Sequence, residues 1–355
     1  MIARQFKSPG DLIDRARLAT ILGRADDVHV APMQGVGYTT ASLSRVDVAV
    51  DGASRSFVLK RTDPRRDWTA CRTGDTRGRE ALLVGDAAFA PLWDIFASPY
   101  VAYAAAPGDV GLLMDDLTSA LLPDVRAPLS DEDETALLGA LARMHARFWN
   151  ADVLTADWLV TPAQYCEVLA PAVAADRSVI DLLSPALQTQ VPLGWASAFT
   201  RTPGAIAWHL MRPGLHWQKE WADLPWTLLH GDAKVANFAR LSDGRVAAFD
   251  WAMAGAGPCT IDLGWYLAVN ASRLTGSKEA AMSRYRALLE TALDKAFPES
   301  IWYRLEHVAI VCGARMLLWS KALAVDSGRP GAEDEWNWWM NRLEPDASLS
   351  WSGIF

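Results

Sequence analysis

The sequence predicts an α+β protein with a strand-rich first part and a larger, mainly helical remainder. Residues 28–62 alternate apolar and polar side chains, which is the pattern of half-buried strands. From about residue 130 onward, apolar residues recur at helical spacing. The chain has 355 residues, more than one domain usually holds, so we expect two lobes.

The first part is expected to contain three strands, then a helix, then two more strands. The dipeptide Asp51-Gly52 separates the second and third strands and is typical of a tight hairpin turn, which makes these two strands antiparallel. The expected strands are residues 28–33, 41–50, 55–62, 100–106 and 110–117, and the expected helix is 76–92.

The helical remainder begins with SDEDETALLGALARMHARFW at residues 130–149. Ser130 suits the N-cap, and the acidic run after it suits the positive end of a helix dipole. A helix start is therefore favoured over a metal-binding cluster of carboxylates. Further helices are expected over 161–222 and from 260 to about 343, with short strands at 226–229 and 245–250 between them.

The composition is that of a soluble globular protein, with 51% hydrophobic and 21% charged residues. A net charge of −8 argues against a nucleic-acid-binding protein, which needs a basic face. The sequence shows neither an uncharged apolar run of about 18 residues nor an apolar signal core, so we expect a cytoplasmic protein without a membrane partner. The four cysteines form no CxxC pair, which favours reduced thiols over a zinc or dithiol site.

The stretch LLHGDAKVANFARLSDGRVAAFDW, residues 228–251, places many polar side chains around two apolar runs. If the two runs pair as a hairpin, Asp232, Asn237 and Asp250 converge at one end of it. Two carboxylates and an amide oxygen are hard ligands suited to Mg²⁺, which shares its coordination with substrate phosphates. Lys234 adds a cation suited to a phosphoryl group in transfer.

Each polar residue of this stretch also has a structural interpretation, since Asp and Asn are common in turns and caps. Taken together, HGDxxxxN followed by an apolar residue, Asp and Trp favours the functional interpretation. His230 is expected to hold the loop rather than to accept a proton.

The segments HGDAKVAN and AFDW resemble motifs of the aminoglycoside phosphotransferase and choline kinase branch of the protein-kinase-like fold. The resemblance implies a bilobal α+β fold, with a small antiparallel sheet and one helix in the N-lobe and a mainly helical C-lobe. It implies that Asp232 is the catalytic base or orients the acceptor, and that Asn237 and Asp250 bind magnesium. Many family members carry His in place of Lys234, which resembles the phosphate-contacting lysine of Ser/Thr protein kinases.

The same fold requires a nucleotide clamp in the first part of the chain. Lys60 lies in the third expected strand among apolar neighbours, where an unpaired ammonium group is costly, and Glu80 is expected to pair with it. The alternative for Lys60 is an edge-strand lysine that faces solvent. Gly35 and Gly37 would let backbone N–H groups approach the phosphates, although such a pair also occurs in ordinary turns.

The resemblance also implies a division into an N-lobe, residues 1–113, a hinge, 114–118, and a helical C-lobe, 119–355, which carries the catalytic loop and the acceptor pocket. Asp262, in GPCTIDLGWYL, resembles a residue that supports the catalytic loop without reacting. Backbone groups of the hinge would bind adenine, and the alternative is a strand end with a polar turn. The hinge residues are Met114, Asp115, Asp116 and Leu117.

The acceptor pocket in this family is built by helices of the C-lobe, which in this chain are rich in Trp. Indole rings stack on sugars and attract cations, and carboxylates near the C-terminus suit an amine substrate. The alternatives are core packing for the Trp residues and a dipole-stabilised helix start for the acidic residues. The candidate substrate residues are Glu333, Asp334, Glu335, Trp336 and Trp339.

These residues predict a kinase that uses Mg²⁺ and ATP or GTP to phosphorylate a hydroxyl of a small metabolite or antibiotic. An amino sugar, an aminoglycoside or another hydroxylated amine is the favoured acceptor, and no oligomeric state is predicted. Two other classes stay open. One is a metal-dependent phosphohydrolase that uses His230, Asp232 and Asp250, and the other is a catalytically silent nucleotide-binding protein.

Overall fold

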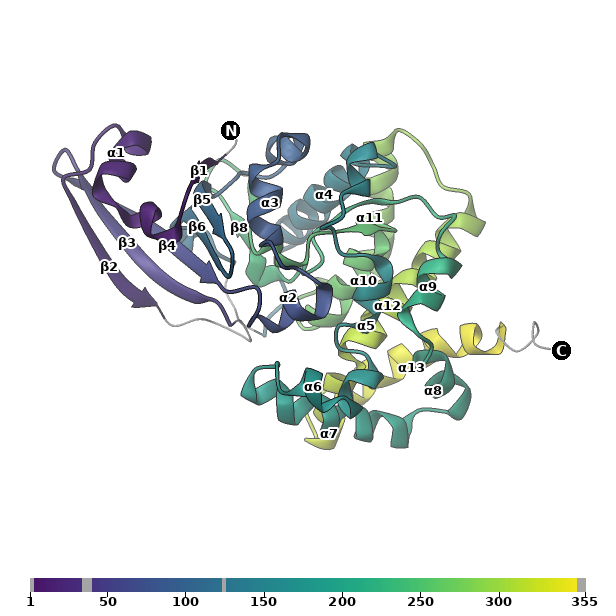
Figure 1. Ribbon diagram of the computed structural model, residues 1–355. Coiled ribbons are helices and arrows are strands. Elements are labelled where there is room, and N and C mark those ends of the chain that lie inside the picture. The colour runs from purple at the N-terminus through teal and green to yellow at the C-terminus, as the bar shows by residue number, and fades with distance from the viewer. Residues whose placement is uncertain (1–2, 34–39, 123–125, 350–355) are drawn as a thin grey trace. The chain divides into compact units, whose positions relative to one another are not determined.

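The computed structural model describes residues 3–33, 40–122 and 126–349 (Figure 1). Contacts within the chain divide it into two compact units. The first unit is residues 1–124 with 236–254, and the second is residues 125–235 with 255–355. The predicted lobes differ from these units in residues 119–124 and 236–254, which were expected in the helical lobe. The predicted hinge stays a prediction.

A six-stranded sheet forms the frame of the first unit, with the strand order β1-β5-β6-β4-β3-β2 (Figure 1). Neighbouring strands are antiparallel except for β1 and β5, which run parallel. The five strands expected from apolar alternation are present, and β1 is added at an edge. The bounds are β1 Arg4–Phe6, β2 Asp27–Met33, β3 Ser42–Val50, β4 Ala53–Thr62, β5 Tyr100–Ala106 and β6 Asp109–Asp115.

The hairpin turn between β3 and β4 has the conformation that its two residues favour. Asp51 and Gly52 have φ angles of 50° and 80°, and two successive positive φ values match the twist of the flanking strands. The resulting register sets Lys60 opposite Leu43 on one side and Leu112 on the other. Lys60 therefore lies on an interior strand of the sheet, and the edge-strand alternative is excluded.

Short helices cover the sheet of the first unit, and there are more of them than the one expected. The predicted helix 76–92 is divided because the Asp86 side chain accepts a hydrogen bond from Ala88 N and starts a new turn there. Leu12 and Leu18 pack with Phe57 and Leu59 in the core of the unit. The bounds are η1 Pro9–Ile13, α1 Arg15–Leu22, α2 Trp68–Thr73, α3 Arg79–Gly85, η2 Ala87–Asp94 and η3 Thr118–Ala120.

Residues 236–254 supply the remaining elements of the first unit, β8 (Phe238–Arg240), β9 (Val246–Ala248) and η7 (Trp251–Met253). Isolated bridges join Ala97 to Ala247 and Leu121 to Ala239. The Phe96 and Phe238 rings lie 6.2 Å apart, so apolar contacts as well as bridges attach this segment.

The expected hairpin between strands 226–229 and 245–250 was wrong. Strand β9 pairs with β8, while β7 (Thr227–Leu229) pairs antiparallel with β10 (Gly255–Gly257) in the second unit. The apolar runs identified two strands correctly, but both true partners are three residues long and carry no detectable alternation. Gly255 and Gly257 suit the crowded β10 position, because a Cβ on Gly255 would lie 2.4 Å from Val160 O.

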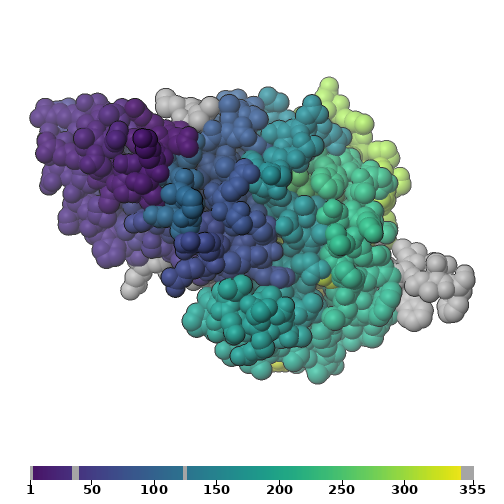
Figure 2. Space-filling view, in the orientation of Figure 1, coloured from purple at the N-terminus to yellow at the C-terminus, as the bar shows by residue number. Residues whose placement is uncertain are grey.

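Helices make up most of the second unit, and the space-filling view shows their side chains closely packed on the face in view (Figure 2). The first begins as predicted, since the Ser130 hydroxyl accepts a hydrogen bond from Asp133 N. The bounds are α4 Asp131–Arg147, η4 Asp152–Thr155, α5 Pro162–Glu167, η5 Pro171–Ala175, α6 Arg177–Ile180, α7 Pro185–Arg201, α8 Gly204–Leu210, α9 Gly214–Glu220, α10 Thr260–Val269, α11 Lys278–Leu293, α12 Glu299–Asp326 and α13 Ala332–Leu349. The short helix η6, Val235–Asn237, begins in the second unit and ends in the first.

Helix α12 is the one described helix that is long and apolar enough to cross a membrane. Of the most apolar stretch of this helix, 72% is buried inside the protein, as in the core helix of a globular protein. The four cysteines are free: Cys71 is exposed, and Cys166, Cys259 and Cys312 are buried. This agrees with the interpretation of the cysteines as mostly buried thiols.

Candidate active site

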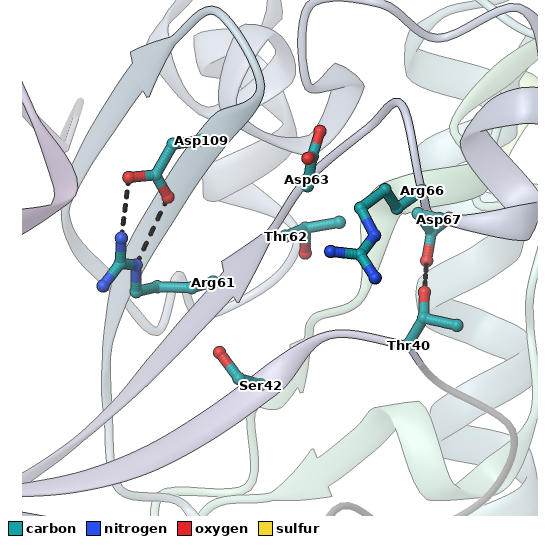
Figure 3. A pocket seen from close by; sticks show the side chains of 8 residues that line it. All are labelled: Thr40, Ser42, Arg61, Thr62, Asp63, Arg66, Asp67 and Asp109. Carbon is teal, nitrogen blue, oxygen red and sulfur yellow. Dashed lines mark hydrogen bonds and ion pairs between the residues drawn. The ribbon is translucent and has the colours of Figure 1, made fainter.

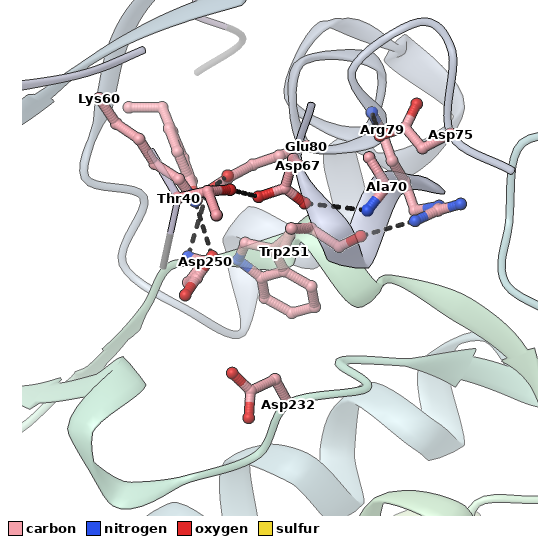
Figure 4. A network of polar contacts seen from close by, with 12 residues as sticks. Thr40, Lys60, Asp67, Ala70, Asp75, Arg79, Glu80, Asp232, Asp250 and Trp251 are labelled. Atoms are coloured by element: carbon pink, nitrogen blue, oxygen red, sulfur yellow. Dashed lines mark hydrogen bonds and ion pairs between the residues drawn. The ribbon is translucent and has the colours of Figure 1, made fainter. Parts of the chain in front are cut away.

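Lys60 lies between two carboxylates within the first unit (Figure 4). Its Nζ is 2.6 Å from Glu80 Oε2, on α3, and 2.6 Å from Asp250 Oδ1, which follows β9. Only 11% of the Lys60 side chain is exposed, so these two ion pairs satisfy a nearly buried ammonium group. Three residues that are distant in the sequence, and that were all predicted as site residues, therefore meet in one polar network.

The network fixes Glu80 as firmly as Lys60. Glu80 Oε1 accepts hydrogen bonds from the Tyr100 hydroxyl, at 2.6 Å, and from Asp250 N, at 3.1 Å. Burial opposes the charged form of Lys60, but the charges of Asp250 and Glu80 outweigh it and raise the pKa of Lys60 well above its usual value. Burial and the charge of Glu80 raise the pKa of Tyr100, which stays a neutral donor. Tyr100 was not predicted from the sequence.

Asp250 has a left-handed backbone conformation, with φ 64° and ψ 56°. This conformation is costly for a residue other than glycine and persists where the surroundings impose it, often at functional sites. Here Glu80 accepts from the backbone N–H of Asp250, and Lys60 binds its carboxylate. The position thus has the contacts needed to hold an unfavourable backbone.

Asn237 and Asp250 lie at the same end of the β8–β9 hairpin. Asn237 immediately precedes β8, and its carbonyl oxygen accepts a hydrogen bond of 3.2 Å from Phe249 N, just after β9. An amide and a carboxylate are oxygen donors of the kind that Mg²⁺ takes from proteins when phosphates supply the rest. Within the described part of the chain, no three His, Cys, Asp or Glu side chains form a metal cage. An amide and a carboxylate alone would fit a Mg²⁺ ion only if other groups supplied its remaining ligands.

The loop that carries Asp232 belongs to the second unit and is held by Asp262 of α10. The two carboxylate oxygens of Asp262 accept from His230 N, at 2.8 Å, and Gly231 N, at 2.7 Å. Gly231 has a φ of 77°, a conformation that glycine adopts at little cost. Asp262 is fully buried, and its carboxylate accepts from two consecutive backbone N–H groups of the loop.

Two further side chains support this loop and were not predicted. Asn270, at the end of α10, accepts from Val235 N at 2.9 Å and donates to Ala233 O at 3.1 Å. His145 of α4 is fully buried, and its Nε2 lies 3.1 Å from Asp262 Oδ2. Local sequence patterns could not identify either residue, because their partners lie 35 or more residues away in the chain.

The Asp232 carboxylate has a polar partner on each oxygen. Trp265 Nε1 of α10 donates to Oδ1 at 2.7 Å, and Lys234 Nζ lies 2.9 Å from Oδ2. His230 Nδ1 accepts from Asp232 N at 3.3 Å, which fits the loop-holding position expected for His230. The loop therefore presents a partly exposed carboxylate of fixed orientation beside a cation.

We expect Asp262→Ala to lower the free energy of unfolding by about 3 kcal/mol, because two buried N–H groups lose their acceptor. Denaturant unfolding followed by circular dichroism measures this change. The control is Asp223→Ala, which removes an exposed ion pair with Arg304 and should change the free energy of unfolding much less. Equal stability of the two variants would contradict the supporting position of Asp262.

The predicted hinge residues span the end of β6, since Met114 and Asp115 are its last two residues and Asp116 and Leu117 follow it. Met114 is buried, Asp115 N donates to Pro99 O at 2.8 Å, and Asp116 N donates to Ser56 O at 3.3 Å. The Asp116 side chain accepts from Thr118 N at 3.0 Å, which forms a turn after the strand. These contacts fit both an adenine-binding strand end and the simpler polar turn. Leu117 follows them, and Gly35 and Gly37 lie outside the described residues.

The candidate substrate residues of α13 are largely engaged in packing. Trp336 and Trp339 are buried, and Trp339 Nε1 donates to Glu335 Oε1 at 2.9 Å. Glu335 also pairs with Lys278 and Lys321, which favours a structural interpretation of these three residues. Glu333 is exposed and Asp334 lies beside it on the first turn of the helix.

A pocket of about 410 Å³ lies in the first unit near the end of β4 (Figure 3). Three carboxylates and two guanidinium groups line it, and Arg61 pairs with Asp109 at 2.7 Å. The lining residues are Thr40, Ser42, Arg61, Thr62, Asp63, Arg66, Asp67 and Asp109. None of the predicted site residues is among them, and the mixture of charges agrees with a solvated loop better than with an anion site.

Comparison with known families gives the class of the protein. A model described as the phosphotransferase enzyme family matches residues 41–296, more than half of the chain. The chain belongs to this family. The match spans Lys60, Glu80 and the whole stretch from His230 to Asp262.

Solved structures similar to this phosphotransferase include two choline kinases. The enzyme from Cryptosporidium parvum Iowa II shares 10% identity, with 92% of this chain and 91% of that chain covered and a TM-score of 0.48. LicA from Streptococcus pneumoniae shares 11%, with 93% and 97% covered and a TM-score of 0.45. Aminoglycoside phosphotransferase APH(3'')-Id from Streptomyces rimosus shares 17%, with 85% and 99% covered and a TM-score of 0.45. No match was found among the curated proteins.

Family membership makes the chain a phosphotransferase that acts on an alcohol group. It confirms the recognition made from HGDAKVAN and AFDW. The α+β class is also confirmed, since this phosphotransferase combines a mostly antiparallel sheet with a larger helical unit.

Proposed function

We propose that this phosphotransferase transfers the γ-phosphate of ATP or GTP, with Mg²⁺, to a hydroxyl group of a small hydroxylated amine, amino sugar or aminoglycoside. The observation that supports it most strongly is Lys60, held at 2.6 Å from both Glu80 and Asp250. Burying a cation between two carboxylates costs desolvation free energy, which suggests a functional reason for it. Binding of a triphosphate is such a function. We place the protein in the cytoplasm, where nucleoside triphosphates are abundant.

On the nucleotide side, Lys60 binds the phosphates while Glu80 keeps its ammonium group in position. Because Glu80 also accepts from Tyr100 and from the backbone of Asp250, its carboxylate has little freedom to move away. Gly35 and Gly37 are proposed to approach the phosphates through backbone N–H groups. The backbone of Met114, Asp115, Asp116 and Leu117 is proposed to bind the adenine or guanine base.

Asn237 and Asp250 are the proposed magnesium ligands, at the common end of the β8–β9 hairpin. When bound, Mg²⁺ neutralises phosphate charge and helps to orient the γ-phosphate. Asp250 would then both bind the metal and hold Lys60, since its Oδ1 pairs with Lys60. The left-handed backbone of Asp250, fixed through Glu80, serves both tasks by holding the carboxylate at the hairpin end.

On the acceptor side, Asp232 orients the substrate hydroxyl and takes its proton. The acceptor oxygen forms a bond to the γ-phosphorus while the bond from that phosphorus to the β–γ bridging oxygen breaks, and the nucleoside diphosphate leaves. Lys234 supplies a positive charge for the phosphoryl oxygens during transfer. His230 and Asp262 keep the loop in place, and neither is given a chemical step.

The acceptor class rests on the acidic start of α13, where Glu333 and Asp334 are the remaining candidates for binding an amine. Glu335, Trp336 and Trp339 would then shape this region through packing rather than through direct contact.

The test is an acceptor screen with γ-labelled ATP and GTP that covers aminoglycosides, amino sugars, neutral sugars and amino alcohols. We expect label on the hydroxyl of at least one cationic acceptor, in a reaction that requires Mg²⁺. Label found only as free phosphate would favour the phosphohydrolase alternative. A nucleotide-dependent rise in melting temperature without turnover of any acceptor would favour a catalytically silent protein.

A further inference from the structure

We infer that Trp265 is a positioning residue, whose indole N–H fixes the orientation of the Asp232 carboxylate; this inference rests on the proposed function of Asp232. Trp265 Nε1 donates to Asp232 Oδ1 at 2.7 Å, a short hydrogen bond to the group that is proposed to receive the acceptor proton. Lys234 contacts the other oxygen at 2.9 Å, so the two partners act on different atoms of the carboxylate.

Helix α10 provides a rigid base for this contact. Asp262 and Trp265 are three residues apart and therefore lie on one face of the helix. Asp262 holds the backbone at His230 and Gly231, and Trp265 holds the side chain of the next residue, Asp232. One helix thus fixes both the main chain and the reacting side chain of the loop.

A carboxylate needs such a partner, because the terminal torsion of Asp is broad and its oxygens rotate readily. An indole is a rigid donor without acceptor capacity, so it can orient the carboxylate without taking up a proton itself. Each carboxylate oxygen has two lone pairs, so the bond from Trp265 leaves Oδ1 able to accept a substrate hydroxyl.

Core packing does not account for Trp265. Trp195, Trp217 and Trp221 of the same unit are at most 2% exposed, as expected for indoles that fill a core. Trp265 is only partly buried, and it directs its polar atom toward a partly exposed carboxylate. A loss of turnover in Trp265→Phe without a matching loss of stability would therefore report its hydrogen bond.

The contact can be tested without any substrate by fluorine NMR of protein labelled with 5-fluorotryptophan. The chain has 17 tryptophans, and the Trp265 resonance is the one that disappears in Trp265→Phe. We expect Asp232→Ala to shift this resonance and to leave that of Trp302, whose indole N–H donates to Glu306, unchanged. An unmoved Trp265 resonance would overturn the inference, whatever acceptor the enzyme uses.

Kinetics then test positioning. Trp265→Phe should lower kcat about 10- to 100-fold, with KM for nucleotide and acceptor unchanged within about twofold, because a misplaced catalytic group costs about that much. Trp265→His keeps a ring N–H donor and should retain more turnover than Phe. Trp302→Phe is the matched control, since its indole also donates to a carboxylate, Glu306 at 2.8 Å, outside the site.

The double variant Asp232→Ala/Trp265→Phe separates this inference from the proposed function. If Trp265 acts through Asp232, the double variant should be no slower than Asp232→Ala alone. Normal kcat in Trp265→Phe, or a raised KM with unchanged kcat, would overturn the positioning role while leaving the kinase proposal intact. Normal turnover in Asp232→Ala would instead reject the proposed role of Asp232.

Discussion

Asp232→Ala is expected to lower kcat for phosphoryl transfer by about 10²- to 10⁴-fold, the usual contribution of a positioned general base. The side chain contacts Trp265 and Lys234, and its removal takes away the proposed proton acceptor and the partner of both. Nucleotide binding is assigned to other residues, so the Kd for ATP or GTP should change by less than about threefold. Single-turnover kinetics with labelled nucleotide and a separate binding titration measure the two quantities.

Asp223→Ala serves as the control for this variant. Asp223 is an exposed aspartate of the same unit that pairs with Arg304, so its loss should leave kcat unchanged. If Asp232→Ala retained turnover within tenfold of the parent, Asp232 could not be the catalytic base. If both binding and turnover were lost, a melting curve would show whether the loop had unfolded.

Lys60→Met should have the second large effect, and it should affect both stability and activity. Removal of the ammonium group leaves Glu80 and Asp250 without their shared cation, and breaking a buried ion pair from one side costs about 3–5 kcal/mol. If Lys60 binds the phosphates as proposed, its loss should also lower kcat/KM for the nucleotide by at least about 10²-fold. Denaturant unfolding and initial-rate kinetics measure the two effects.

The double variant Lys60→Met/Glu80→Gln separates the effect on stability from the effect on activity. Glu80→Gln removes one of the two uncompensated charges, so stability should partly recover while kcat/KM stays low. Recovery of activity together with stability would show that Lys60 acts only through folding. An unchanged unfolding midpoint in Lys60→Met would contradict the ion-pair geometry itself.

The direction of the Lys60 pKa shift sets how the stabilisation from its ion pairs depends on pH. The pKa of Lys60 is raised in the folded protein from an ordinary value of 10.5, so the stabilisation is fully present below that pH. It is lost only as the pH rises above 10.5 toward the higher folded-state pKa. The difference in free energy of unfolding between the parent and Lys60→Met should therefore stay constant across neutral pH as far as the titration of Lys60 is concerned.

Local patterns predicted the elements of the fold better than their partners. Alternation located the five longer strands, and Ser130 with its acidic run located the start of α4. The predicted pairing of β7 with β9 was wrong. Tertiary packing decides the partners of three-residue strands, and the alternation of apolar residues does not report it.

The site followed the same rule. Lys60, Glu80 and Asp250 were predicted together because a fold-wide motif connects them, and the structure brings them within hydrogen-bond distance. Tyr100, His145, Trp265 and Asn270 were missed, since a common Tyr, His, Trp or Asn carries no signal until its distant partner is known. On α13, Trp336 and Trp339 are buried and Glu335 pairs with Lys278, and a substrate contact by this acidic and aromatic run stays a prediction.

The attachment of residues 236–254 to the first unit affects how the protein is made. During synthesis the six-stranded sheet emerges from the ribosome long before Asp250 does. Lys60 therefore lacks one of its two counter-ions until 190 further residues have been translated. An N-terminal fragment that ends at residue 124 would lack β8, β9 and η7 permanently. The ion-pair network around Lys60 can therefore be completed only after residue 250 has been made, and residues 1–124 alone cannot complete it.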